Sequence, residues 1–263
     1  MRLKEARLPP SQRLAGPSTA GIFCCTPAKL SIMRQFLTLV ALLIFSKTLP
    51  AAEWQQLFNG RDLTGWHANN NPESFAVKDG VIRIQAPGTA CAHLFYVGEP
   101  KGGVTKDQSK KDNAAKAEPV KFKNFELEAV VRAEPNSNGG IFIHTEMAVR
   151  DKALHLARGY EVQLNSSAKE KRKTGSLYAI VDLDESPVDE TKWFTINVKV
   201  RDKRITVAID GKEILDYTEP PNAERPKERA GRLLATDGGG IALQAHDKDS
   251  VWYFKEVKVR RLD

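Results

Sequence analysis

Apolar and polar residues alternate along several segments of the chain after residue 53. The clearest are 125–132, 194–200 and 252–259, in which most alternate residues are apolar. A period of two places neighbouring side chains on opposite faces of an extended strand, so these segments are predicted to be strands with one buried face. No long segment has the spacing of three to four residues that marks an amphipathic helix.

Two further alternating segments each contain an Asp-Gly pair, at Asp79-Gly80 and Asp210-Gly211. Asp-Gly favours the two-residue turn that joins antiparallel strands. Short strands with frequent turns, in a domain of this length, predict an all-β fold, an antiparallel two-sheet β-sandwich or jelly roll. The segments 97–119, 168–173 and 218–240 are expected to be loops, the first a mobile insertion.

The chain before residue 53 has a different pattern. A basic start at Met33 precedes an apolar run at 36–45, and small residues follow as far as Ala52. This is the layout of a secretory signal peptide, and the run is too short for the ~20 residues of a membrane-spanning helix. The predicted organisation is a leader or gene-model extension at 1–32, a signal peptide at 33–52 and one domain at 53–263. Cleavage near Ala52 would give a periplasmic or secreted protein with no membrane span.

The leader also accounts for the basic character of the chain. The whole chain carries 40 basic and 33 acidic residues, but seven of the basic and one of the acidic residues lie before residue 53. The remainder has a net charge of +1, which gives no bulk attraction to nucleic acid. Of the three cysteines only Cys91 follows the leader. An internal disulfide and a cysteine-rich zinc motif are therefore excluded for the mature domain, and Cys91 is expected to be inert.

An ordered series of short motifs runs through the domain. They are LFNGRDLTGW at 57–66, FAVKDGVI at 75–82, FKNFEL at 122–127, NGGIFI at 138–143, GYEVQL at 159–164, TGSLY at 174–178, KW at 192–193, GIALQAH at 240–246 and VWYFKEV at 251–257. Over 54–262 the series resembles the 3-keto-disaccharide hydrolase domain family. The resemblance implies an exported bacterial protein, a concanavalin- or laminin-G-like jelly roll and a carbohydrate partner. The chain departs from the family pattern at His144, where members often carry Arg, and around Asn165, where they often carry an acidic residue.

Polar residues recur on one face of the predicted strands. In the strand 160–165, Glu161, Gln163 and Asn165 alternate with apolar residues, and their carboxylate and amide groups suit the binding of sugar hydroxyls. The same alternation picks out His144 on the face of Phe142, and also Tyr178, Gln244 and His246. If these strands are neighbours in one sheet, as the resemblance implies, the polar side chains line one groove.

The resemblance also implies a reaction. A ketone on the sugar ring acidifies the adjacent C–H bond, a base removes that proton, the aglycone leaves by elimination and water adds. Glu161 is the predicted base, and His144 or His246 is the predicted acid because imidazole titrates near neutral pH. The predicted substrate-binding residues are Gln163, Tyr178, Gln244 and Asn165. No cofactor is predicted; two histidines and a glutamate are compatible with a divalent metal, but no spacing motif identifies such a site.

Three functions remain open at this point. They are a hydrolase of (3-keto) glycosides, a non-catalytic carbohydrate-binding or adhesion module, and an ordinary two-carboxylate glycosidase. The last lacks the Glu-x-Asp-x-x-Glu strand motif. An enzyme would hold Glu161 within reach of a His or Tyr in a cleft, whereas a binding module would leave it beside an exposed aromatic platform. For Trp66, Trp193 and Trp252, core packing is the prediction.

Overall fold

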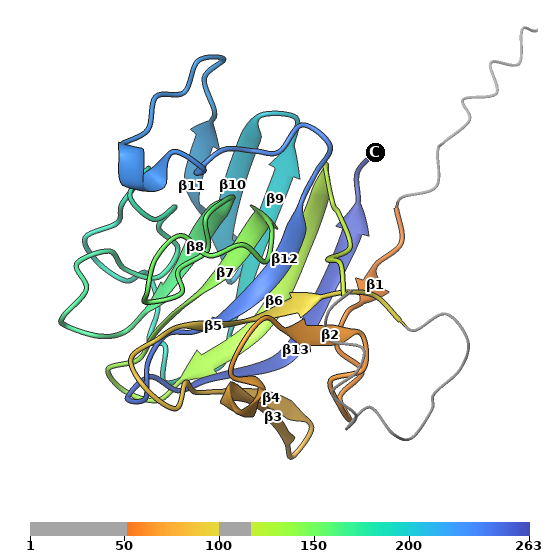
Figure 1. Ribbon diagram of the computed structural model, residues 1–263, viewed down its shortest axis with the longest axis vertical. Helices are drawn as coiled ribbons and strands as arrows, with labels where there is room; N and C mark the ends of the chain where they lie inside the picture. The colour runs from red at the N-terminus through yellow and green to blue at the C-terminus, as the bar shows by residue number, and fades with distance from the viewer. Residues whose placement is uncertain (1–51, 100–116) are drawn as a thin grey trace, which may run out of the picture. The chain divides into compact units, whose positions relative to one another are not determined.

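The structure is a computed structural model that describes residues 52–99 and 117–263 (Figure 1). The predicted leader and nearly all of the predicted signal peptide lie outside the described residues, as does most of the predicted insertion at 97–119. Within the described part, no helix is long and apolar enough to cross a membrane.

Two antiparallel sheets make up the described domain. The large sheet has the order β11-β10-β9-β6-β13-β4-β3, and β1 also pairs with β13. Its strands are β1 (Gln55–Gln56), β3 (Phe75–Lys78), β4 (Val81–Ile84), β6 (Phe125–Ala133), β9 (Phe194–Arg201), β10 (Arg204–Ile209), β11 (Lys212–Thr218) and β13 (Trp252–Arg261). The small sheet has the order β2-β5-β12-β7-β8, and Figure 1 shows the last four side by side. Its strands are β2 (Trp66–Ala68), β5 (Ala92–Tyr96), β7 (Asn138–Thr145), β8 (Tyr160–Asn165) and β12 (Gly240–Ala245). The 3-10 helices are η1 (Pro72–Ser74) and η3 (Lys227–Arg229).

This architecture confirms the predicted all-β, two-sheet sandwich. Both Asp-Gly turns form as expected: Asp79 and Gly80 have φ of 52° and 76°, and β3 and β4 pair across them. Positive φ at two successive residues is what a two-residue hairpin turn requires, and glycine adopts it without steric cost. Asp210 joins β10 to β11 in the same way.

The main core lies between the two sheets. In β6 the apolar residues Phe125 and Leu127 are almost completely buried, while the residues between them are half-buried. In β8, Tyr160 faces the same core, and Trp66 and Trp252 pack into it as predicted. The prediction for Trp193 is wrong, because this residue precedes β9 and leaves 42% of its surface exposed.

The small sheet is buried on both of its faces. Every residue of β5, β8 and β12 is buried, although alternate side chains point away from the main core. On this outer face Phe95, Phe142 and Ala242 form a second apolar cluster with Leu156, which belongs to the connection between β7 and β8. The outer face is therefore covered by loops, and polar side chains that point outwards from these strands are withdrawn from water.

Candidate functional site

Strand register arranges the outer-face side chains of the small sheet in rows. Phe95 pairs with Ala242, Ala242 with Phe142, and Phe142 with Glu161. The next row contains His93 opposite Gln244, and Gly140 opposite Gln163. Because the strand alternation that was read from the sequence is correct here, Glu161, Gln163 and Gln244 do share one face.

Glu161 is held in a buried ion pair with Arg232. The guanidinium donates to Oε2 of Glu161 at 2.9 Å, and the two side chains are only 9% and 3% exposed. Arg232 comes from the connection between β11 and β12 and lies 5.3 Å from the ring centre of Phe142. Gly140 makes room for the carboxylate, since a Cβ there would lie 3.1 Å from Cγ and Oε1 of Glu161. Burial lowers the pKa of Arg232, and the neighbouring Glu161 opposes that shift.

Tyr178 lies beside this ion pair. Its backbone N–H donates to the carbonyl of Glu161 at 2.9 Å, and its hydroxyl donates to Oε2 of Glu170 at 3.1 Å. The guanidinium groups of Arg172, Arg229 and Arg232 lie 4.6, 5.5 and 6.0 Å from its ring centre. Burial raises the pKa of Tyr178, and the charges of Glu170 and Glu161 raise it further, so the phenol stays protonated and can donate at neutral pH.

The segment that carries Tyr178 is a turn and not the strand that its pattern indicated. Leu177 makes isolated bridges to Val162 and Val181, and no longer ladder forms. The turn nevertheless brings Tyr178 to Glu161, because the backbone of residues 175–178 hydrogen-bonds to Gln163 and Glu161 of β8.

The two glutamines differ in their contacts. The amide nitrogen of Gln163 contacts Oδ1 of Asn138 at 3.1 Å; turned by 180°, the amide would instead donate to the carbonyl of Gly139 and to Oε1 of Glu161. Gln244 lies further along the face, with its amide nitrogen 3.5 Å from Nε2 of His93 and 3.8 Å from Sγ of Cys91. Both are almost completely buried.

Asn165 holds the loop that follows β8. Its amide nitrogen donates to the carbonyls of Glu170 and Arg172 at 2.8 Å each, and its oxygen accepts from the N–H of Ser167 at 2.8 Å. These bonds occupy the amide, so the structure shows a loop-stabilising contact for Asn165 and none with Glu161.

His144 does not lie with Glu161, and the prediction that it shares a face with Phe142 is wrong. Its φ of 51° breaks the alternation of β7 and turns the ring toward Phe125, with ring centres 6.0 Å apart. The Nε2 atom contacts the carbonyl of Lys123 at 2.9 Å. Burial lowers the pKa of His144, with partial opposition from hydrogen bonds to backbone carbonyls.

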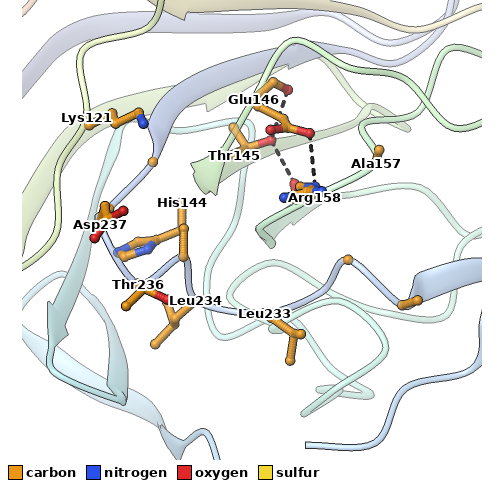
Figure 2. A pocket seen from close by; sticks show the side chains of 15 residues that line it. Lys121, His144, Thr145, Glu146, Ala157, Arg158, Leu233, Leu234, Thr236 and Asp237 are labelled. Carbon is orange, nitrogen blue, oxygen red and sulfur yellow. Dashed lines mark hydrogen bonds and ion pairs between the residues drawn. The ribbon is translucent and has the colours of Figure 1, made fainter.

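His144 instead lines a cavity of about 710 Å³ at the far end of β7, shown in Figure 2. The cavity wall includes the ion pair of Glu146 and Arg158, with N···O at 3.1 Å, and the segment 233–239. None of the other six predicted site residues lines it. The polar residues of the buried outer face therefore lie in a different part of the domain from this cavity.

His246 lies at the opposite edge of the outer face, directly after β12. Its Nδ1 contacts Oδ2 of Asp247 at 2.8 Å. His155 makes the matching contact with Asp151, at 2.9 Å from Nδ1 to Oδ2. Ligand-type atoms of Cys91, His155 and His246 all lie within 4.8 Å of one another.

His93 is completely buried and lies between the ion pair of Glu161 and the cluster that contains His246. Its ring stands edge-on to Phe142, with centres 5.1 Å apart. Burial lowers the pKa of His93 to about 3, and the charges of His155, Arg232 and His246 act in the same direction. His93 is therefore neutral at physiological pH and joins the Glu161 and His246 groups into one polar region.

Four residues of this region were not identified from the sequence: His93, His155, Arg232 and Cys91, the last of which was considered inert. The alternation at 91–95 carries a usable signal, because it places Cys91, His93 and Phe95 on one face of a strand. Arg232 and His155 lie in irregular connections, where no periodicity assigns a direction to a side chain.

Comparisons with known proteins agree with the fold. A provisionally assigned glycosyl hydrolase of Parabacteroides distasonis ATCC 8503 is 21% identical, with a TM-score of 0.60 over 80% of this chain and 94% of that chain. Another from the same organism is also 21% identical, with a TM-score of 0.53 over 80% of this chain and 100% of that chain. No curated protein matches the chain. A family model described as the 3-keto-alpha-glucoside-1,2-lyase-like domain matches residues 53–260. The resemblance noted in the sequence motifs is confirmed, and the chain belongs to this family.

Proposed function

We propose that this protein cleaves 3-keto glycosides by elimination, at the outer face of the small sheet. The observation that carries the proposal is the buried ion pair of Glu161 and Arg232 with the half-buried Tyr178 beside it. Polar groups withdrawn from water act on a substrate more strongly than the same groups at a surface, because the surrounding dielectric constant is lower.

The elimination needs three functions, which these residues can supply. The C2 proton beside the ketone passes to a base, the C1–O bond to the aglycone breaks, and a C1=C2 double bond forms; addition of water then gives the free 3-keto sugar. Glu161 is the base, since Arg232 holds one of its oxygens and leaves the other free to accept a proton. The positive charge of Arg232, next to this base, can stabilise the enolate charge that develops on the substrate.

The leaving oxygen needs a proton donor. Tyr178 is half-buried and keeps its proton at neutral pH, so it can donate to the aglycone oxygen or to the enolate. His246, the other residue predicted as the acid, follows β12 and clusters with Cys91 and His155 rather than with Glu161, which favours Tyr178 as the donor. Gln163 and Gln244 are left to bind sugar hydroxyls.

The same geometry favours an enzyme over a carbohydrate-binding module. The carboxylate of Glu161 is not isolated, because it pairs with Arg232, whose guanidinium lies 6.0 Å from the ring centre of Tyr178. The exposed tryptophan, Trp193, contacts Arg132 of β6 and so belongs to the large sheet, away from Glu161. An aromatic platform beside Glu161 would have favoured binding alone.

Aglycone release from a 3-keto glycoside and from its unoxidised parent tests the proposal. Release from the keto substrate alone is expected, and Glu161→Gln should slow it roughly hundredfold or more, as expected for loss of a general base. Glu126→Gln is the matched control, because Glu126 is an outward-facing glutamate paired with an arginine on the other sheet. Unchanged turnover in Glu161→Gln would overturn the assignment of the base. Sugar binding without release from either substrate would establish a binding module instead.

A further inference from the structure

Three segments far apart in the sequence bring metal-ligating atoms together on the outer face of the small sheet. Cys91 precedes β5, His155 belongs to the connection between β7 and β8, and His246 follows β12. One ligand atom from each lies within 4.8 Å of the other two. We propose that Cys91, His155 and His246 bind a divalent transition-metal ion of the zinc class.

The orientation of the two histidines is the first argument. Asp151 and Asp247 each occupy the Nδ1 side of one ring, at 2.9 and 2.8 Å, which directs Nε2 away from the carboxylate. A carboxylate that holds the second nitrogen of a histidine is the usual outer shell of a zinc site, because it fixes the ring and makes Nε2 a better ligand. Two such pairs beside one cysteine can supply the inner and outer shells of a metal site.

The position of Cys91 is fixed by its backbone. Its N–H donates to the carbonyl of Ala153 at 2.9 Å, and its carbonyl accepts from the amide of Asn70 at 2.8 Å. The first bond ties Cys91 to the loop that carries Asp151 and His155. Ligands that are held in place before the metal arrives lose less conformational entropy when they bind it.

The distances are compatible with a tetrahedral ion after a small adjustment. Zn–S and Zn–N bonds of about 2.3 and 2.05 Å separate neighbouring ligand atoms by roughly 3.3–3.6 Å. The three atoms must therefore close by about an ångström. Both histidine side chains are about one third exposed, so their rings have room to move, whereas Cys91 is buried and stays in place.

Gln244 supplies a second argument. Its amide nitrogen lies 3.8 Å from Sγ of Cys91, where an N–H donor stabilises a thiolate ligand. Within the described residues, Oε1 of Gln244 and Nδ1 of His93 are buried without a hydrogen-bond partner. Buried polar atoms normally have a partner. Gln244 contacts both Cys91 and His93, so the two atoms indicate that a polar ligand can bind in this region.

Three protein ligands leave one coordination position open, which is the arrangement of catalytic rather than structural zinc. A metal at this position can polarise an oxygen of a bound molecule. That the bound oxygen belongs to a keto sugar rests on the proposed function. The metal site itself does not, and can be tested without any turnover.

Cobalt binding is the test, with the metal-stripped full chain titrated by Co²⁺. About one equivalent should bind, with a thiolate-to-cobalt charge-transfer band in the near ultraviolet and the visible bands of tetrahedral Co²⁺. Cys91→Ser should abolish the charge-transfer band, and Asp247→Asn should lower metal affinity roughly ten- to hundredfold. His67→Gln, which changes a histidine of β2 in the same sheet but outside the cluster, is the control and should bind as the wild type does.

His155→Gln, at a half-buried position in a connection, keeps the test valid if Cys91→Ser fails to fold. Absence of stoichiometric Co²⁺ binding, or a spectrum unchanged in both Cys91→Ser and His155→Gln, would overturn the site. The two proposals fail separately: stoichiometric metal without cleavage of the keto substrate removes the proposed reaction and leaves the site. Cleavage by a chain that binds no metal removes the site and leaves the reaction.

Discussion

Glu126 of β6 and Glu161 of β8 are both outward-facing glutamates that pair with an arginine, one on each sheet. The pair of Glu126 and Arg260 keeps 13% and 32% of its side chains exposed, whereas Glu161 and Arg232 keep 9% and 3%. Loops cover the small sheet and leave the large one in water. The two carboxylates are similarly buried, and the difference lies in the arginines: water reaches Arg260 on one sheet, whereas Arg232 on the other is withdrawn from it.

The difference decides what each pair contributes. An exposed ion pair gains little, because water screens the charges and already solvates them. A buried pair must be complete, because either partner alone would be a charge in a medium of low dielectric constant. Binding and catalytic chemistry is thus expected on the outer face of the small sheet.

Breaking the two ion pairs gives the largest expected contrast. Arg232→Met should lower the free energy of unfolding by about 3–5 kcal/mol, because it leaves Glu161 buried without a partner. Arg260→Met should cost about 1 kcal/mol or less, since Arg260 is 32% exposed, so water can replace its guanidinium, and Asn197 still donates to Glu126. Urea unfolding of both variants at pH 7 measures this. Equal losses would show that burial does not separate the two sheets.

Glu219 sharpens the comparison, since it is a second buried carboxylate beneath the same connection that carries Arg232. It accepts from Tyr160 and from the N–H of Leu234, both at 2.7 Å, and pairs with Lys203 at 2.6 Å. Burial alone would raise its pKa, but these hydrogen bonds, from Lys203 first, outweigh burial and lower it. Because the folded-state pKa is depressed, its contribution to stability is present above its ordinary pKa of 4.5 and is lost as pH falls through the folded value.

Glu219→Gln should therefore lower the free energy of unfolding by about 2–3 kcal/mol at pH 7, as expected for lost charge-assisted hydrogen bonds. The loss should shrink as the pH is lowered below the ordinary carboxyl pKa, where the wild type loses the same contribution. Thermal unfolding from pH 7 to pH 3 checks this, with Glu213→Gln at an exposed position of β11 as the control. A loss that is constant with pH would contradict the assigned role of the carboxylate.

The outward direction of Glu161, Gln163 and Gln244 could be predicted from sequence because it depends on local strand geometry alone. Burial of that face could not be predicted, because it depends on where the connections 146–159 and 219–239 come to lie. Contacts between distant residues, such as that of Glu219 with Tyr160, determine their positions. For the same reason Arg232 had no signal in the sequence.

His144 shows how a single residue defeats the pattern. The positive φ of His144 rotates its side chain out of the alternation. Its neighbours Ile143 and Thr145 are both typical strand residues, so the sequence does not predict this break. Cys91 raises a different point, and the prediction that it is inert stays a prediction. The absence of a CxxC spacing excluded a local metal motif, whereas the structure assembles its cluster from three distant segments.

The two adjacent glycines of β7 lie on opposite faces of one strand, so substitutions at them allow the two faces to be compared. A Cβ at Gly139 would lie 2.9 Å from the ring of Trp252 in the core, whereas a Cβ at Gly140 would meet the side chain of Glu161 at 3.1 Å. Gly139→Ala should cost about 1–3 kcal/mol of stability, because the packed ring has little room to shift. Gly140→Ala should cost less, but should lower kcat by displacing the carboxylate. Urea unfolding and keto-substrate turnover of both variants separate the effects, and unchanged turnover in Gly140→Ala would argue against Glu161 as the base.

Trp193 gives the smallest expected effect and tests whether its exposed ring on the large sheet has any part in sugar recognition. Its ring lies 5.4 Å from the guanidinium of Arg132, a contact that contributes about 0.5–1 kcal/mol at an exposed site. Trp193→Ala should lose no more stability than this and should bind and cleave the keto substrate as the wild type does, as measured by calorimetry and aglycone release. Tyr178→Phe, which removes only the hydroxyl that donates to Glu170, should instead reduce turnover, because this hydroxyl is the proposed proton donor. If Trp193→Ala abolished sugar binding while Tyr178→Phe changed nothing, the working face would be that of the large sheet, because a solvated aromatic platform would then be the recognition site.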